Sequence, residues 1–244
     1  GARLISMQDV SVTDHSPQGL VLEMLKPDEL RQRLESFGIS SDSRIVIYYG
    51  KDWVSPTTRI IFTLDYAGLG DRVSLLDGGM REWVRAGNEV TDAATPARKG
   101  TLAALNVRPL IVDAPFVRAH LEAKGFRVVD GRTSVYYDGV ETGGGMGEQH
   151  RTGHLPGAGS IPFTSLTDDR GLLLPRAELQ ALFDKAGVKN GDTVIGYCHI
   201  GMQTTVMLFA ARLLGHRVLL YDGSMQDWSR RADFPVVNPQ QASR

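Results

Sequence analysis

The chain contains an internal repeat. Residues 77–83 read DGGMREW and residues 222–228 read DGSMQDW, a separation of 145 positions. Upstream of each motif lies an apolar run with the character of a β-strand, at residues 44–49 and 192–198. A likeness confined to one heptapeptide could arise by chance, but chance does not explain a likeness that also includes the upstream apolar runs. The sequence therefore predicts two units with one common fold.

The spacing of the repeat drifts smoothly along the chain. The separation is 152 at Gly19, 147 at Thr58 and 145 in the motif, as small loop insertions and deletions would leave it. Extended backwards, the match aligns residue 1 with Gly157, whereas the second unit has further strand-like and helix-like segments from residue 110 onward. We therefore expect the first unit to be incomplete at its N-terminus, without a helix and one or two strands. A first unit that never had them is the alternative.

Strand-like and helix-like segments alternate in both units. In the second unit, strands are predicted at residues 126–130, 160–162, 193–197 and 218–221, and helices at 115–124, 177–185 and 204–214. Short apolar strands separated by helices are typical of a mostly parallel sheet covered on both faces. The predicted fold class is therefore α/β, with two tandem domains that each hold such a sheet. The reactive crevice of this architecture lies at the C-terminal ends of the strands.

The segment between the two units is rich in small residues and shows no periodicity. We therefore place a first domain at residues 1–92, a linker at residues 93–108 and a second domain at residues 109–244. A chain of 244 residues is long enough for two domains of ordinary size.

Composition limits the classes of partner. The chain carries 27 basic and 28 acidic side chains, and no block of Lys or Arg stands out, so nothing indicates binding to nucleic acid or to an anionic membrane. No apolar stretch approaches the roughly 18 residues of a membrane-spanning helix. The single cysteine, Cys198, excludes an internal disulfide and a multi-cysteine zinc site, but it allows one reactive thiol.

Cysteine usage also bears on the compartment. A chain with one cysteine and no disulfide suits the cytoplasm, which we favour, and a periplasmic location is the alternative. A secretory signal would belong to the N-terminal part that we expect to be absent.

Cys198 is placed where a thiol can react. It follows the predicted strand 193–197 directly, and a predicted helix begins at Thr204 after a short loop. The unpaired amides and the dipole at a helix start favour negative charge, so this position favours the thiolate. Gly201 allows the loop to turn tightly enough for several amides to point inward. A buried, inert cysteine is the alternative reading.

Four short motifs follow one another in the second domain. They are VVDGR at residues 128–132, GHLPGA at 153–158, CHIG starting at Cys198, and YDGSMQDW at 221–228. In this order and spacing the chain resembles the rhodanese (sulfurtransferase) family, and the likeness extends to the first domain through Trp83. The resemblance implies a tandem-domain rhodanese, similar to thiosulfate and 3-mercaptopyruvate sulfurtransferases, whose second domain is active.

The first domain is predicted to be inactive. The repeat places Tyr49 at the position of Cys198, and a phenol cannot perform the chemistry of a thiol. The loop that follows Tyr49 is also two residues longer than its counterpart. Asp52 and Trp53 in this loop either face Cys198 across the domain interface or belong to an ordinary surface loop.

The resemblance implies a two-step transfer of sulfur. The thiolate of Cys198 attacks the outer sulfur of a small anionic donor such as thiosulfate, and a thiophilic acceptor then removes the sulfur from the resulting persulfide. The acceptor is cyanide, a small thiol or a thiol protein. The resemblance also assigns binding of the charged persulfide to the loop residues His199, Ile200, Gly201, Met202, Gln203 and Thr204. It implies no metal and no organic cofactor.

Departures from the family pattern bear on the choice of donor. Tyr136 stands where two-domain members carry an arginine that binds the donor anion. The second arginine of mercaptopyruvate-using members has no clear counterpart, although His150 and Arg151 lie nearby. Besides the thiol, His199 is the only ionisable group in the loop, and it is expected to supply positive charge below about pH 6.5. We therefore expect modest activity with thiosulfate.

Three motif residues have both a structural and a functional interpretation. Arg132 is placed among the residues that contact substrate or persulfide, and we favour a brace of the loop through a buried pair with a carboxylate such as Asp130. His154 is expected to organise its turn by hydrogen bonding rather than to act as a base. Trp228 is expected to pack under the loop as part of the core.

The same loop bears on rival functions. Phosphatases and arsenate reductases of similar fold need an arginine six residues after the cysteine, and that position is Thr204, which disfavours phosphoryl chemistry. No motif supports the oriented histidine of a papain-like hydrolase. The remaining alternative is a sulfur-carrier or sensing module, in which Cys198 passes sulfur only to a protein partner. The sequence does not separate this carrier from an enzyme.

Overall fold

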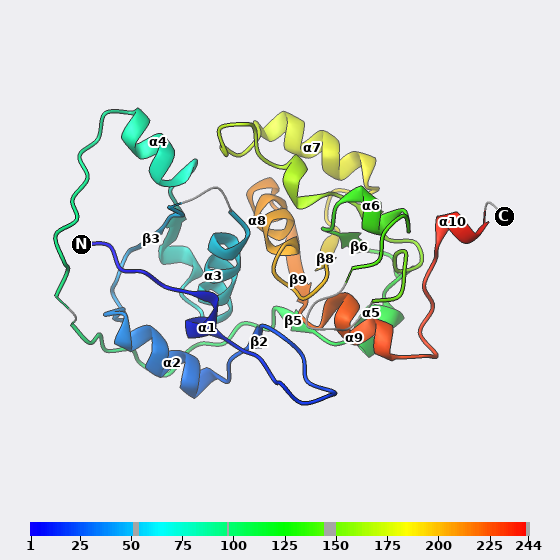
Figure 1. Ribbon diagram of the computed structural model, residues 1–244, viewed down its shortest axis with the longest axis horizontal. Helices are drawn as coiled ribbons and strands as arrows, with labels where there is room; N and C mark the ends of the chain where they lie inside the picture. Colours follow the sequence, from blue (N-terminus) through cyan, green and yellow to red (C-terminus); the bar gives the residue numbers. More distant parts are fainter. Residues whose placement is uncertain (51–53, 97, 144–149, 243–244) are drawn as a thin grey trace.

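The computed structural model shows two domains side by side, with the N-terminus at the outer side of the first and the C-terminus at the outer side of the second (Figure 1). It describes residues 1–50, 54–96, 98–143 and 150–242. Asp52 and Trp53, considered above as residues that face Cys198, lie outside the described residues. No helix in the described ranges has the length and apolar character needed to cross a bilayer.

The first domain consists of short elements around a small core. They are α1 (Met7–Val10), β1 (Ser11–Val12), β2 (Glu23–Met24), α2 (Pro27–Ser36), β3 (Ile45–Ile47), α3 (Val54–Tyr66), a 3-10 turn (Gly70–Arg72), β4 (Val73–Leu75) and α4 (Gly79–Arg85). Strands β1 and β2 form an antiparallel ribbon, and β3 pairs with β4 in parallel. The core gathers Leu30 and Leu34 of α2 against Ile60 and Leu64 of α3.

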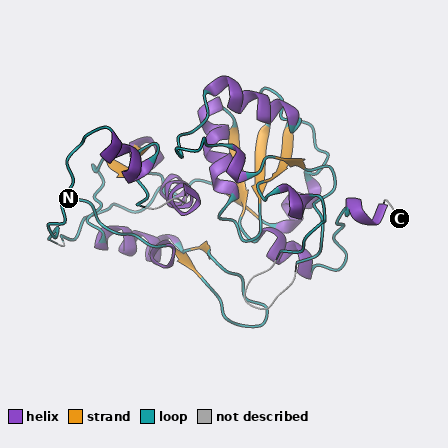
Figure 2. Ribbon diagram, turned by 45° about the horizontal axis from the view of Figure 1, so that its top comes forward, coloured by secondary structure: helices purple, strands orange, loops and turns teal. Residues whose placement is uncertain are grey.

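The second domain is built around one larger sheet. Its elements are β5 (Ile111–Val112), α5 (Ala114–Ala119), β6 (Phe126–Asp130), α6 (Ser134–Tyr137), β7 (Gly159–Ser160), a 3-10 turn (Phe163–Ser165), α7 (Arg176–Lys185), β8 (Thr193–Tyr197), α8 (Thr204–Leu214), β9 (Arg217–Tyr221), α9 (Ser224–Arg230) and α10 (Pro239–Ala242). The five strands are all parallel, in the order β5-β9-β8-β6-β7. Helices flank the sheet (Figure 2), so the predicted α/β fold is confirmed.

Neighbouring residues of each central strand serve different cores. On β6, Val128 packs with residues of α5 and α9, whereas Val129 packs with residues of α7 and α8. Because both faces are covered, these strands appear in the sequence as continuous apolar runs. Trp228 of α9 is fully buried, and its indole N–H donates to the carbonyl of Pro235 at 2.9 Å, so it is a core residue as predicted.

Two predicted elements are shorter than expected. The helix expected at residues 115–124 ends at Ala119, and the ring of His120 then bonds back to the carbonyl of Phe116 at 2.7 Å. The strand expected at residues 160–162 ends at Ser160, because Pro162 has no amide to donate to a neighbouring strand.

The segment predicted as a linker packs against the first domain. Leu102 is buried in the first-domain core, and its amide donates to the carboxylate of Glu35 at 3.0 Å. Leu105 also packs against this core. Two apolar residues among small ones show too little periodicity for the sequence pattern to reveal this attachment.

The two domains meet along α3 and α8, which lie side by side in the centre of the molecule (Figure 1). Phe62 of α3 shares a core with Leu208 of α8. The hydroxyls of Thr58 and Thr205, equivalent positions of the repeat, contact each other at 2.8 Å. The interface is therefore built from corresponding helices of the two repeated units.

The aspartate of each repeated motif is bound by the other domain. The amide of Leu173 donates to Asp77 at 3.0 Å, and the amide of Met24 donates to Asp222 at 2.9 Å. The Asp-Gly pair that revealed the repeat therefore contributes to a reciprocal clasp between the domains. The motif is recognisable in the sequence, but its role in the clasp is not.

Glu23 is a half-buried acid at the same interface. Its Oε1 has no hydrogen-bond partner among the described residues. Burial raises the pKa of Glu23 to about 8, and the neighbouring carboxylates of Asp222 and Asp227 add to the rise against the opposing charge of Arg59. The side chain therefore holds its proton at neutral pH.

We predict that stability falls as pH rises through the range from about 4.5 to about 8. In this window the folded chain keeps the proton of Glu23, whereas the unfolded chain releases it, so the folded state binds more protons. Glu23→Gln should remove this contribution. At pH values above 8 its unfolding temperature should be higher than that of the unmodified chain, and at acidic pH the two should be nearly equal. Thermal unfolding at a series of pH values measures this difference. Glu122→Gln, at an exposed position, is the control. Equal pH profiles for Glu23→Gln and the unmodified chain would contradict the assignment.

Candidate active site

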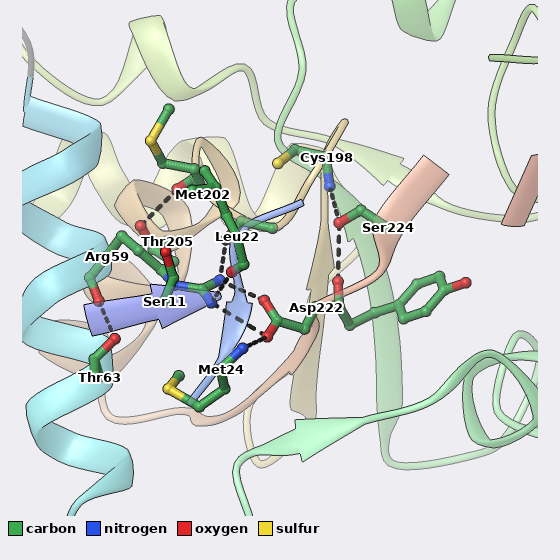
Figure 3. A network of polar contacts seen from close by, with 12 residues as sticks. Ser11, Leu22, Met24, Arg59, Thr63, Cys198, Met202, Thr205, Asp222 and Ser224 are labelled. Carbon is green, nitrogen blue, oxygen red and sulfur yellow. Dashed lines mark hydrogen bonds and ion pairs between the residues drawn. The ribbon is translucent and has the colours of Figure 1, made fainter. Parts of the chain in front are cut away.

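Cys198 lies directly after β8, in a loop that ends where α8 begins (Figure 3). Its amide donates to the hydroxyl of Ser224 at 3.1 Å, and its carbonyl accepts from the amide of Met225 at 3.1 Å. The start of α9 therefore fixes the backbone of the cysteine. The position at the C-terminal ends of two parallel strands agrees with the crevice rule for such sheets.

The first domain repeats this backbone arrangement around Tyr49. The carbonyl of Tyr49 accepts from the amide of Met80 at 3.0 Å, as that of Cys198 does from Met225. Gly79 and Ser224 both adopt left-handed backbone conformations, with φ of 61° and 49°. The structural match agrees with the predicted equivalence of Tyr49 and Cys198. The tyrosine hydroxyl donates to the carbonyl of Gly171 at 2.8 Å, so it serves the domain contact.

The loop after Cys198 leaves its amides open and ties down its carbonyls. In the described part of the chain, the amides of residues 199–203 make no hydrogen bond to backbone acceptors. The carbonyl of Gly201 accepts from Arg59 at 2.9 Å, and that of Met202 accepts from the hydroxyl of Thr205 at 2.7 Å. Donors without acceptors, next to a helix start, form an arrangement suited to an anion.

Three loop side chains also carry open polar atoms. Nδ1 of His199, Oε1 of Gln203 and Oγ1 of Thr204 are buried and have no partner among the described residues. Ile200 and Met202 are half-buried and apolar. The predicted loop is therefore one continuous segment. Its amides are without acceptors in the described part of the chain, and none of the side chains of residues 200–204 carries a charge.

The thiol of Cys198 is fully buried, whereas the sequence suggested a thiol at the mouth of a crevice. Two cavities, of about 1050 and about 150 Å³, lie elsewhere and are not lined by Cys198 among the described residues. Segments that precede the loop pack onto it: the ring of Tyr136 meets that of His199 edge-on at 4.6 Å, and the ring of His150 lies 5.6 Å from it. A reagent therefore reaches the sulfur only when the surroundings move.

The expectation that His199 supplies positive charge below about pH 6.5 is wrong. Burial, together with the charge of Arg132, lowers the pKa of His199 to about 3. The imidazole is therefore neutral over the whole physiological range. The packing of Tyr136 on this ring contributes to the burial, and it is a non-local feature that the sequence pattern does not reveal.

Arg132 and His154 serve the structure around the loop. Arg132 is fully buried, donates to Asp130 through bonds of 2.6 to 3.1 Å, and donates to the carbonyl of Gly153 at 2.7 Å. The favoured pair with Asp130 is therefore present, and it ties the end of β6 to the GHLPGA turn. His154 bonds the carbonyl of Tyr137 at 2.7 Å and stacks on its ring at 3.8 Å, as expected for an organiser of the turn.

Arg151 does not take part in the loop. Its guanidinium donates to the carbonyls of Trp228 and Phe234 at 3.3 and 2.6 Å. Of His150 and Arg151, only His150 lies beside the Cys198 loop. The structure thus brings Tyr136 and His150 to the site and leaves Arg151 with the C-terminal segment.

Comparison with known proteins agrees with this geometry. Residues 113–231 match the Rhodanese-like domain family model. The thiosulfate sulfurtransferase of Rattus norvegicus is 30% identical over 218 residues, which cover 86% of this chain and 71% of the rat protein. The chain belongs to the rhodanese family. The probable 3-mercaptopyruvate sulfurtransferase of Pseudomonas aeruginosa is also 30% identical, over 86% of this chain and 73% of its own length. Such relatives identify this rhodanese as a sulfurtransferase.

Solved structures share the fold over nearly the whole chain. The wild-type structure of EanB gives a TM-score of 0.84 at 22% sequence identity, covering 98% of this chain and 59% of EanB. The anaerobic ergothioneine biosynthesis enzyme from Chlorobium limicola gives a TM-score of 0.83 at 22% identity. This rhodanese therefore spans about 60% of the length of those chains.

Two residues of the site escaped sequence analysis. Arg59 and Asp222 form a buried ion pair across the domain interface, with side chains that are 0% and 3% exposed. The available signal was the repeat itself, because Arg59 sits in an apolar helix at the position that Val206 occupies in the second domain. A charge in place of a core residue, beside the matching threonines, marks a buried partner.

We predict that Gly201→Ala disables the loop. Gly201 has φ of +76°, and a Cβ there would lie 2.6 Å from both the carbonyl and a carboxylate oxygen of Asp222, so the loop must shift. The strained backbone alone costs about 1 to 3 kcal/mol. Sulfur transfer should be lost while the variant remains folded.

Gly215→Ala is the matched control for that substitution. Gly215 closes α8 with φ of +99°, but nothing lies within 4 Å of an added Cβ. It should lower the unfolding midpoint and keep activity. Comparable activity in both variants would show that the close contact at Gly201 is unimportant.

Proposed function

We propose that this protein transfers sulfane sulfur from thiosulfate or a related small anionic donor to cyanide or a thiol, through a persulfide on Cys198. The observation that carries the proposal is the set of open amides at residues 199–203 beside the only cysteine of the chain. Such donors stabilise the negative charge of a thiolate and of a terminal persulfide sulfur in the same way. The sulfurtransferase relatives support the same chemistry.

The proposed reaction has two balanced steps. The thiolate of Cys198 attacks the outer sulfur of thiosulfate, the sulfur–sulfur bond of the donor breaks with its electron pair on sulfite, and a cysteine persulfide anion forms. Cyanide or a thiolate then attacks the outer persulfide sulfur. That sulfur leaves as thiocyanate or as a new persulfide, and the thiolate of Cys198 is restored.

The charge of the donor must be held mainly by backbone amides. His199 is neutral, Tyr136 stands in place of a cationic side chain, and Arg132 is committed to Asp130 and the carbonyl of Gly153. Amides without a nearby cation bind a dianion more weakly than a guanidinium pair does. We therefore expect thiosulfate to be a modest donor.

We predict that a sulfane donor adds the mass of one sulfur atom to the chain, at Cys198. Mass spectrometry of the intact protein after incubation with thiosulfate, mercaptopyruvate or polysulfide measures this addition. Cys198→Ser should take up nothing. If no donor of the panel leaves an adduct, the proposed function fails.

The same preparation separates an enzyme from a carrier. Steady production of thiocyanate from thiosulfate and cyanide, abolished in Cys198→Ser, supports the enzyme. Labelling that stops at one sulfur per chain, with release only to a protein acceptor, supports the sulfur-carrier or sensing module instead.

Ionisation of the Cys198 thiol can be followed without a reagent that reaches the buried sulfur. The ultraviolet absorbance of the thiolate is measured against pH, with Cys198→Ser as a blank.

A further inference from the structure

Arg59 reaches the back of the active loop from the first domain (Figure 3). Its side chain is fully buried. The guanidinium donates to the carbonyl of Gly201 at 2.9 Å and to the carbonyl of Leu22 at 2.7 Å, and it pairs with Asp222. One side chain of the domain without a nucleophile thus binds the loop, the β1–β2 ribbon and the motif aspartate together.

The residue before Arg59 supports the next peptide of the loop. Thr58 contacts the hydroxyl of Thr205 at 2.8 Å, and Thr205 donates to the carbonyl of Met202 at 2.7 Å. Two consecutive residues of α3 therefore act on two consecutive loop carbonyls, one directly and one through Thr205.

Fixing these carbonyls also fixes the amides that follow them. A trans peptide is planar, so its N–H points opposite to its C=O. With the Gly201 carbonyl held toward Arg59, the amide of Met202 faces the other side of the loop. With the Met202 carbonyl held toward Thr205, the same holds for the amide of Gln203. Both amides belong to the set that is open in the described part of the chain.

We propose that Thr58 and Arg59 are positioning residues for sulfur transfer, which hold the amides of Met202 and Gln203 toward the sulfur of Cys198. This inference rests on the proposed function. The first domain, although it carries Tyr49 in place of the nucleophile, thereby supplies part of the machinery of the second.

The charge of Arg59 argues against a role in domain cohesion alone. Burying a guanidinium carries a large desolvation cost, and a well-packed apolar side chain is often at least as stabilising. The second domain has such a residue, Val206, at the corresponding position. Cohesion by ion pairing is available at the other end of the same helices, where Asp65 of α3 pairs with Arg212 of α8. Among the contacts of Arg59, the bond to the Gly201 carbonyl is the one that reaches the active loop.

The test compares variants at the two ends of the α3–α8 contact in the full chain. Thr58→Val removes one hydroxyl and keeps the shape of the side chain, and Arg59→Met removes the guanidinium. Arg212→Met is the matched control, since it breaks the ion pair far from the loop. For each variant, the pH midpoint of thiolate absorbance, the kcat for thiocyanate formation at saturating thiosulfate, and the unfolding midpoint are measured.

Positioning predicts a specific pattern. Thr58→Val and Arg59→Met should raise the pH midpoint of thiolate formation and lower kcat by about tenfold, less than the roughly hundredfold loss that follows removal of an oxyanion donor itself. Thr58→Ser, which restores the hydroxyl, should recover both. Arg212→Met should lower only the unfolding midpoint.

Two results would overturn the inference. One is a folded Thr58→Val chain whose thiolate midpoint and kcat equal those of the unmodified protein. This result would overturn the inference even if Arg59→Met failed to fold. The other is an equal shift of both quantities in Arg212→Met, which would indicate general loosening of the interface. The absorbance measurement needs no sulfur donor. If the unmodified chain takes up no sulfur, the proposed function fails, and the absorbance alone still decides the positioning role.

Discussion

Backbone amides that stay unpaired inside a protein are the feature on which the site depends. A buried N–H without an acceptor is unfavourable, and folded chains rarely leave several together. In the described part of the chain, the segment after Cys198 leaves the amides of residues 199–203 without an acceptor, while the carbonyls of Gly201 and Met202 are engaged by Arg59 and Thr205. Its left-handed glycine lies so close to Asp222 that an added Cβ would collide with it.

Duplication explains how such a loop is held. The corresponding helices α3 and α8 face each other, and each repeated aspartate accepts an amide from the opposite domain. The same clasp surrounds two different loops, one that carries Tyr49 and one that carries Cys198. Divergence at a few positions therefore separates a supporting unit from a reactive one without altering the contact between them.

The local sequence pattern was sufficient to predict the elements that carry the site. The predicted boundaries of β8 and α8 match the observed ones, because the apolar runs are sharply bounded by Cys198, Thr204 and Gly215. The partner of Arg132 was also predictable, since Asp130 lies two residues away. In both cases the deciding residues are neighbours in sequence.

Features set by distant segments were not predictable in this way. The burial of Cys198, the neutral state of His199 and the contact of Arg59 with Gly201 all depend on chain that is far away in sequence. Periodicity and short motifs report the environment along one element. They do not report which ring or guanidinium a neighbouring segment will place on it.

The complete enclosure of the Cys198 sulfur has a chemical consequence. Oxidation of a thiolate to sulfenic, sulfinic and sulfonic acids requires peroxide to meet the sulfur, and exposure governs how readily this happens. In the proposed reaction, a sulfur carried by Cys198 is shielded from oxidants and from reductants alike. Its lifetime then depends on how often movement of the surrounding residues exposes it, and less on the intrinsic instability of a persulfide in water.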